Sequence, residues 1–254
     1  MTIDLYSLGL ALLAATAAGL VGGVALMKRM SLAGDVISHI ALPGLGLALL
    51  WNWNPLIGGA ITLFLGTLII WRLERNTNVS TETAIGVIFT ASVAIGALLT
   101  PSEDLIEALF GGFGIITQGQ FLIGVGLSLA VIAILLAIKD KLMLSLFSPD
   151  LAVSSGVNVD RVHLIYLLLF SGTVLLGLRF LGALLVGALI IIPAAIARQL
   201  THNLKLFFVL SSLAAIFATA IGFVVHVRFG FPLGPSIVSV AAGMFAISTL
   251  KKID

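Results

Sequence analysis

The 254-residue sequence contains no cysteine and few charged residues. Without cysteine, disulfides, thiolate metal sites and thiol nucleophiles are excluded, so any metal must be held by oxygen and imidazole ligands. Charged residues make up only 9% of the chain, whereas hydrophobic residues make up 60% and the mean hydropathy is +1.22. These values lie far outside the usual range of soluble domains, so the sequence predicts an integral membrane protein.

Several functional motifs are also missing. No Gly precedes any Lys, which excludes the phosphate-binding loop of an ATPase and predicts that the chain has no ATPase site of its own. There is no His-Glu-x-x-His sequence, which argues against an intramembrane metalloprotease. The basic residues occur singly or in pairs, which is not typical of nucleic-acid binding. The sequence therefore predicts neither an enzyme nor a nucleic-acid-binding protein.

Apolar runs occupy most of the chain. A helix needs roughly 20 apolar residues to cross the hydrocarbon core, so about nine crossings leave no room for a soluble catalytic domain. We predict a single transmembrane domain, residues 1–254, folded as an all-α polytopic bundle of about nine helices. Eight helices also fit, because the second and seventh runs are short. The runs cover residues 5–27, 36–51, 55–71, 83–100, 119–138, 162–178, 180–197, 206–225 and 233–250.

The basic residues predict the orientation of the chain. If the N-terminus lies outside and nine crossings follow, only Arg179 and Arg228 of the 13 Lys and Arg residues face outward. The positive-inside rule predicts such a split, so we expect an outside N-terminus and a cytoplasmic C-terminus. The first apolar run is not preceded by a basic residue and is too long for a signal peptide, so we expect it to be a retained span.

The second apolar run contains an acid and an imidazole. Asp35 and His39 are four residues apart, so on a helix they share one face, with Ser38 beside them. Placing an ionisable group at membrane depth costs free energy, so such a group normally faces a cavity and interacts with a partner. A metal cation would be a suitable partner for Asp35 and His39. Carboxylate and imidazole suit Zn, Mn or Fe(II), and two facing copies of the chain would supply four ligands. Pro43 is expected to free the His39 carbonyl, which would add an oxygen.

A purely structural interpretation of the same residues stays open at this point. Asp35 would then cap the helix start, and His39 would be a hydrogen-bonded histidine of the bundle. His163, His202 and His226 carry weaker signals and are interpreted as interfacial residues rather than ligands.

Two long polar interruptions organise the loops. Residues 148–157 begin with Ser-Pro-Asp and contain Gly156, which predicts a two-turn helix at the cytoplasmic surface. This helix is either a docking element for a cytoplasmic partner or a plain connector. The other interruption, residues 100–120, contains Glu103, Asp104 and Glu107 and is expected on the outside, where it either meets a delivery protein or caps the bundle.

The chain resembles, almost end to end, the permease subunits of bacterial zinc and manganese ABC importers. The resemblance rests on a collinear set of motifs, of which the first segment is the most specific. These motifs are Met30 to Asp35 with Ser38-His39 and Leu42-Pro43-Gly44, Glu82 to Gly86, Ser148 to Ala152 with Gly156, Gly182 to Gly187, Ile192 to Ala195 with Ala197-Arg198, and Phe231 to Ser236.

The resemblance implies a fold, a set of partners and two functional sites. It implies a type II ABC importer-like bundle in the bacterial cytoplasmic membrane that moves zinc or manganese, with iron as a further candidate, and that binds no permanent cofactor. Its implied partners are a second permease copy (identical or paralogous), a cytoplasmic ATPase that hydrolyses ATP, and an extracytoplasmic metal-binding protein. Asp35 and His39 would lie on the metal path. The residues that would couple to the ATPase are Ser148, Pro149, Asp150, Leu151, Ala152 and Gly156.

Two other transport functions remain as alternatives. A proton- or sodium-coupled secondary transporter can also contain broken helices and one intramembrane Asp and His pair. A siderophore or cobalamin permease would share the coupling arrangement, but it would not need Asp35 and His39.

Overall fold

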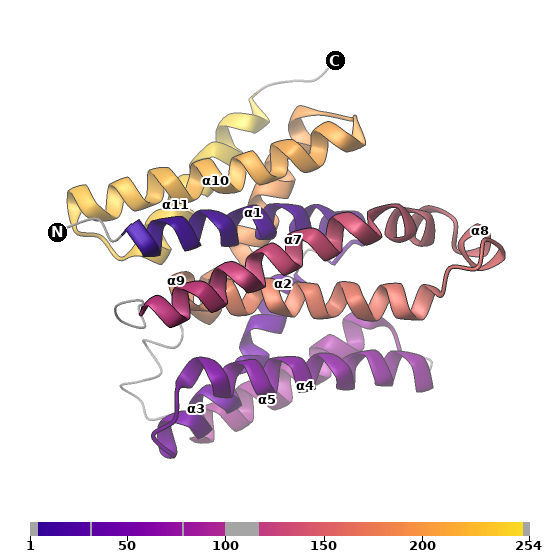
Figure 1. Ribbon diagram of the computed structural model, residues 1–254, viewed down its shortest axis with the longest axis horizontal. Helices are drawn as coiled ribbons and strands as arrows, with labels where there is room; N and C mark the ends of the chain where they lie inside the picture. Colours follow the sequence, from indigo (N-terminus) through magenta and orange to yellow (C-terminus); the bar gives the residue numbers. More distant parts are fainter. Residues whose placement is uncertain (1–4, 31, 78, 100–116, 251–254) are drawn as a thin grey trace.

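The computed structural model describes residues 5–30, 32–77, 79–99 and 117–250. Within these ranges the chain forms helices and no strands, and most of the long helices lie roughly side by side (Figure 1). The helices are α1 (Leu5–Met27), α2 (Ala33–Ser38), the 3₁₀ helix η1 (His39–Ala41), α3 (Leu42–Leu50), α4 (Pro55–Asn76), α5 (Thr81–Leu99), α7 (Gln118–Phe147), α8 (Pro149–Ser154), α9 (Val159–Leu200), α10 (Leu204–Phe229) and α11 (Leu233–Thr249).

All nine predicted apolar runs coincide with helical segments. In the described part of the chain, eight of these segments are long and apolar enough to cross a membrane. The ninth, α11, has 17 residues, which is at the short end of the range for a spanning helix. The predicted polytopic helical bundle is therefore confirmed. The predicted outer segment with Glu103, Asp104 and Glu107 lies outside the described residues.

Helix α9 contains two predicted spans and a sharp change of direction between them. Gly182 has φ 71° and ψ 176°, which is not helical and which residues with a Cβ rarely adopt. A Cβ on Gly177 would collide with the side chain of Val186, nine residues further on. In a straight helix these two residues would be about 13 Å apart along the axis. The chain therefore bends back at Gly182, and the segments Val159–Arg179 and Leu181–Leu200 are separate spans, as predicted.

Helix α7 is longer than its apolar run. The run ends near residue 138, but the helix continues to Phe147 and has 30 residues, which corresponds to a length of about 45 Å. Since roughly 20 residues suffice to cross the membrane, the last turns of α7 extend beyond the hydrocarbon core. These turns carry α8 at the far end of the bundle, as Figure 1 shows.

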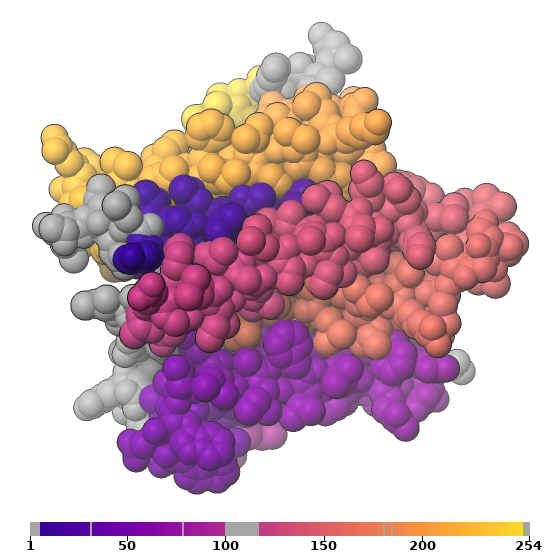
Figure 2. Space-filling view, in the orientation of Figure 1, coloured from indigo at the N-terminus to yellow at the C-terminus, as the bar shows by residue number. Residues whose placement is uncertain are grey.

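The core lies around α1 and α9, and its helices approach one another through small residues. Tyr166 and Phe170 of α9 are fully buried. A Cβ on Gly19 of α1 would lie 2.6 Å from Ser212 Cα of α10, so these backbones are in direct contact. Small residues allow helices in a membrane to approach this closely. In Figure 2, α7 and α4 lie on the near face with part of α9 visible between them.

Candidate metal site

The segment that carries Asp35 and His39 is broken into three short helices. Helix α2 ends at Ser38, His39 begins the 3₁₀ turn η1, and α3 follows with Pro43 in its first turn. Pro43 has no N–H group and so cannot continue the hydrogen-bond ladder of α2. The predicted apolar run therefore forms one broken helical span, and Asp35 and His39 remain one turn apart in it.

The His39 carbonyl is not free, contrary to the expectation from Pro43. The backbone N–H of Leu42 donates to this carbonyl and closes the 3₁₀ turn. A tighter i→i+3 turn thus replaces the missing i→i+4 bond. The oxygen that the sequence suggested as an additional ligand is already hydrogen-bonded.

The His39 ring is held with one nitrogen available. Its Nδ1 lies 2.8 Å from the Asp35 carbonyl oxygen, and its ring makes an edge-to-face contact with the Phe89 ring at a centroid distance of 5.5 Å. A carbonyl oxygen can only accept a hydrogen bond, so Nδ1 carries a proton, and in the neutral form of the ring Nε2 has the lone pair that can bind a metal. This arrangement, in which a backbone carbonyl orients a histidine through its other nitrogen, is typical of metal-binding histidines.

The Asp35 carboxylate is exposed in the single chain and does not cap a helix. The N-cap of α2 is Leu32, without a side-chain capping bond, and Asp35 lies in the first turn after it. The structural interpretation of Asp35 as a helix cap is therefore not supported. Among the described residues, no cluster of three or more His, Asp or Glu side chains could hold a metal ion. One chain therefore supplies two candidate ligands at this position.

Helix α2 is fixed to the second span of α9 by backbone contacts. A Cβ on Gly187 would lie 2.7 Å from Asp35 Cα, and one on Gly34 would lie 3.1 Å from Gly187 Cα. The buried Ser38 Oγ lies 2.5 Å from the carbonyl oxygens of both Asp35 and Ala183. Any movement of α9 against the bundle would therefore be transmitted directly to the backbone of Asp35.

Gly187→Val is expected to displace Asp35 and to reduce metal transport by at least about tenfold, because the new side chain would overlap the backbone of α2 and overpacking of this kind costs about 1–3 kcal/mol. Gly243→Val is the matched control, since a Cβ there meets no atom within 4 Å. Transport rates per inserted permease, measured in proteoliposomes, test this expectation. Normal transport by Gly187→Val would show that the α2–α9 contact does not position the site.

A partly buried polar cluster that the sequence did not suggest joins three helix ends. Lys28 Nζ lies 3.1 Å from His163 Nδ1, and His163 Nε2 lies 2.9 Å from a carboxylate oxygen of Glu74. Burial lowers the pKa of the Lys28 ammonium, and the Glu74 carboxylate offsets part of that shift. The cluster links the ends of α1 and α4 to the start of α9. His163 thus links these helix ends, which is consistent with its interpretation as an interfacial residue rather than a ligand.

The other two histidines also lack a ligand cluster among the described residues. His226 Nδ1 lies 2.6 Å from the Phe231 carbonyl oxygen and ties the end of α10 to the following loop. His202 is exposed in the short connection before α10. Their interpretation as residues outside the metal site is consistent with both positions.

Helix α8 forms at the predicted place. Its N-cap is Ser148, although the Ser148 side chain makes no capping bond, and Pro149 occupies the first turn. Gly156 has φ +77°, and its N–H donates to the Val153 carbonyl, so it ends the helix as predicted. Asp150 lies in the first turn, where its negative charge interacts favourably with the positive end of the helix dipole.

One side of α8 anchors it and the other is exposed. Ala152 is fully buried, whereas Leu151 and Val153 are 59% and 65% exposed. These apolar side chains follow the end of α7, which continues past its apolar run. The position and the exposed apolar side of α8 fit a docking element better than a plain connector.

The sequence of this chain is similar to those of known membrane transport proteins. A model of the ABC 3 transport family matches residues 5–252. The chain is 31% identical over 243 residues to the manganese transport system membrane protein MntC of Halalkalibacterium halodurans, covering 94% of this chain and 83% of the relative. It is 31% identical over 245 residues to the high-affinity zinc uptake system membrane protein ZnuB of Buchnera aphidicola subsp. Baizongia pistaciae, covering 94% of both.

A solved structure has a similar fold. The chain superposes on a chain of PsaBC from Streptococcus pneumoniae in complex with Fab with a TM-score of 0.82 and 30% sequence identity. The match covers 95% of this chain and 89% of the other. The similarity thus extends over almost the whole helical bundle.

Proposed function

The chain belongs to the ABC 3 transport family, and on this premise we propose that it is the membrane-spanning subunit of an ATP-driven importer of zinc or manganese, with iron as a further candidate. Similarity to relatives named for manganese transport and zinc uptake supports this substrate class. The observation on this chain that carries the proposal is the pair Asp35 and His39, with the His39 ring oriented through its Nδ1 and the Asp35 side chain exposed.

The transported ion would bind between two copies of the chain. Each copy contributes one carboxylate and one imidazole, so a site on a two-fold axis has two oxygen and two nitrogen ligands. Such a mixed set suits Zn, Mn or Fe(II), whereas Mg and Ca prefer oxygen ligands alone. The exposure of Asp35 in the single chain fits this arrangement, because the second copy would cover it.

The two ends of the bundle would have different partners, and these partners would set the direction of transport and supply its energy. We propose that the end carrying α8 is cytoplasmic and that α8 docks on an ABC ATPase, which hydrolyses ATP because this chain has no phosphate-binding loop. An extracytoplasmic metal-binding protein would deliver the ion at the opposite end, where the N-terminus is proposed to lie. Closure of the ATPases would move α8 and α9, and the Gly34–Gly187 contact would pass this movement to Asp35.

Uptake of radioactive zinc and manganese into proteoliposomes tests the proposal. The vesicles contain this chain with its ATPase and its metal-binding protein, and we expect accumulation that requires ATP. Competition between the two unlabelled ions ranks their affinities. Uptake driven by a proton or sodium gradient without ATP would favour the secondary transporter, and ATP-driven uptake of cobalamin or a siderophore without free metal would favour the chelate permease.

A further inference from the structure

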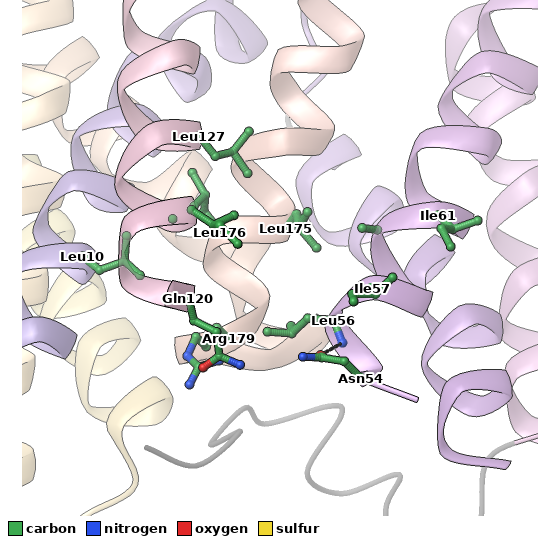
Figure 3. Close-up of a pocket in the computed structure, with 13 residues that line it drawn as sticks. Leu10, Asn54, Leu56, Ile57, Ile61, Gln120, Leu127, Leu175, Leu176 and Arg179 are labelled. Atoms are coloured by element: carbon green, nitrogen blue, oxygen red, sulfur yellow. Dashed lines mark hydrogen bonds between the residues drawn. The ribbon is translucent and has the colours of Figure 1, made fainter. Parts of the chain in front are cut away.

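A pocket of about 230 Å³ lies beside the candidate metal site, between the first turns of α2 and α5. Its two charged lining residues are Arg29, in the turn after α1, and Glu82 of α5. A different groove, between α4 and α7, has no acidic residue among the described residues that line it (Figure 3). That groove offers a cation no carboxylate, whereas the pocket between α2 and α5 does.

The pocket lies toward the end of the bundle that carries α8. Helices α1 and α4 directly precede α2 and α5 in the chain, and their ends are linked through His163 to the start of α9. Helix α8 comes immediately before that start. An ion that leaves Asp35 and His39 toward α8 would therefore pass the pocket.

Helix α5 runs beside the broken α2–α3 span in the same direction. A Cβ on Gly96 would lie 2.7 Å from Leu42 Cβ, and the ring of Phe89, seven residues earlier, contacts the ring of His39. Glu82 is a further seven residues earlier, which corresponds to about 10 Å along the axis of α5. Glu82 thus lies two turns from the level of His39, on the side of α8.

The face of α2 that carries the candidate ligands also lines the pocket. Leu32, Asp35, Val36 and His39 follow one another at the spacing of residues on one helix face. Leu32 and Val36 line the pocket, and His39 lies next to Phe89 of α5. The pocket is therefore continuous with the face on which Asp35 and His39 lie.

The matching face of α5 leaves room for an ion. Glu82, Gly86 and Phe89 share this face, since they are four and three residues apart. A Cβ on Gly86 would meet no atom within 4 Å, so the space between the levels of Phe89 and Glu82 is open. The Glu82 residue is exposed in the single chain, and its carboxylate is an oxygen ligand that a divalent ion can reach.

The charges around the pocket fit a site that binds an ion only briefly. Among the described residues, neither Arg29 nor Glu82 belongs to an ion pair, although both line the pocket. The guanidinium of Arg29 repels a divalent cation at Glu82 and weakens its binding. A site along a transport path must hold the ion weakly enough for it to leave.

We propose that Glu82 is a release site, at which the transported divalent ion binds after it leaves Asp35 and His39 and before it reaches the end of the bundle that carries α8. The inference rests on the proposed function, because it concerns the same ion. In a purely structural role, Glu82 would only stabilise the start of α5 through the helix dipole. The two roles predict different results for charge, metal preference and pocket volume.

Glu82→Gln tests the charge in proteoliposomes that contain the permease, its ATPase and its metal-binding protein. We expect ATP-driven uptake to fall at least about tenfold, the lower end of the effect of losing a group that supports metal binding. ATP hydrolysis stimulated by the loaded binding protein should persist, because α8 is unchanged. Glu82→Asp keeps the carboxylate and should retain most of the uptake. Asp140→Asn is the matched control, since Asp140 is exposed on α7 outside the pocket.

Glu82→His tests contact with the metal, because imidazole suits zinc whereas manganese prefers oxygen ligands. We expect the ratio of zinc uptake to manganese uptake to rise at least about threefold relative to the wild type. Normal uptake by Glu82→Gln, or an unchanged ratio in Glu82→His, would overturn the inference. The absence of ATP-driven uptake by the wild type would instead overturn the proposed function.

Gly86→Leu tests the pocket without altering charge and decides the question if Glu82→Gln fails to fold. The new side chain has room, so the thermal unfolding midpoint should stay close to the wild-type value, but it would fill the space between Asp35 and Glu82. Uptake should fall at least about tenfold, whereas Gly126→Leu, at a similarly open position on α7, should transport normally. Normal uptake by Gly86→Leu would show that the ion does not pass through this pocket.

Discussion

Asp35→Ala and His39→Ala are each expected to lower ATP-driven uptake of zinc or manganese by about 100-fold or more, with normal insertion into the membrane. If the ion binds on a two-fold axis, each substitution removes two of its four ligands. Loss of an outer-sphere partner of a metal ligand typically costs 10–100-fold in metal affinity, so loss of two direct ligands costs at least as much. Uptake per inserted permease and stimulation of the ATPase by loaded binding protein are the measurements.

Asp35→Asn separates charge from shape, because the amide keeps the size of the side chain but not its negative charge. We expect it to be nearly as impaired as Asp35→Ala. His202→Ala is the matched control for His39→Ala, since His202 is exposed and lies outside the site. Wild-type uptake by both Asp35→Ala and His39→Ala would remove these residues from the metal path, even if ATP-driven metal import itself were observed.

Leu151→Asp is expected to uncouple the permease from its ATPase without unfolding the bundle. Leu151 is 59% exposed on α8, so a charge there costs the single chain little, but it would be desolvated in an apolar groove of a partner. Central apolar contacts of protein interfaces often contribute 2 kcal/mol or more, which corresponds to a loss of affinity of roughly 30-fold. Co-purification of the ATPase and ATP-driven uptake should both fall.

Ser155→Asp is the control for Leu151→Asp, because it adds the same charge at an exposed position just after the same helix. The thermal unfolding midpoint of the purified permease should be close to the wild-type value for both variants. Normal co-purification and transport with Leu151→Asp would show that α8 is a connector and that the ATPase docks elsewhere.

The sequence predicted the helices of this protein well, because an apolar run in a lipid bilayer can satisfy its backbone hydrogen bonds only by forming a helix. Backbone groups in a bilayer must be bonded internally, so a run of about 20 apolar residues becomes a helix almost regardless of its neighbours. This is why α1 begins and ends at the limits of the first run. Helix α8, Pro149–Ser154, is instead bounded by Ser148 before it and Gly156 after it. Turn and cap residues act locally, so their effects can be predicted without the fold.

Features that depend on the approach of distant segments could not be predicted in this way. The 3₁₀ turn at His39 uses the carbonyl that Pro43 was expected to release, because the local backbone tightened instead of leaving the group free. The Lys28–His163–Glu74 cluster joins residues up to 135 positions apart, and nothing in the sequence pairs them. Helix α7 continues beyond its apolar run through Lys139, Asp140 and Lys141, where hydropathy predicts the end of the membrane span but not the end of the helix.

The sequence by itself determined that the chain is a membrane bundle and where its helices lie, and it singled out Asp35 and His39 as candidate ligands of a transition metal. Composition and spacing carry this information because solvation in lipid and helical periodicity are local constraints. Only the tertiary structure decided that the Asp35 carbonyl orients the His39 ring, that Gly187 packs on the backbone of Asp35, and that His163 links Lys28 to Glu74. Each of these depends on which helices pack together, and that choice is made by side-chain shape across the whole bundle.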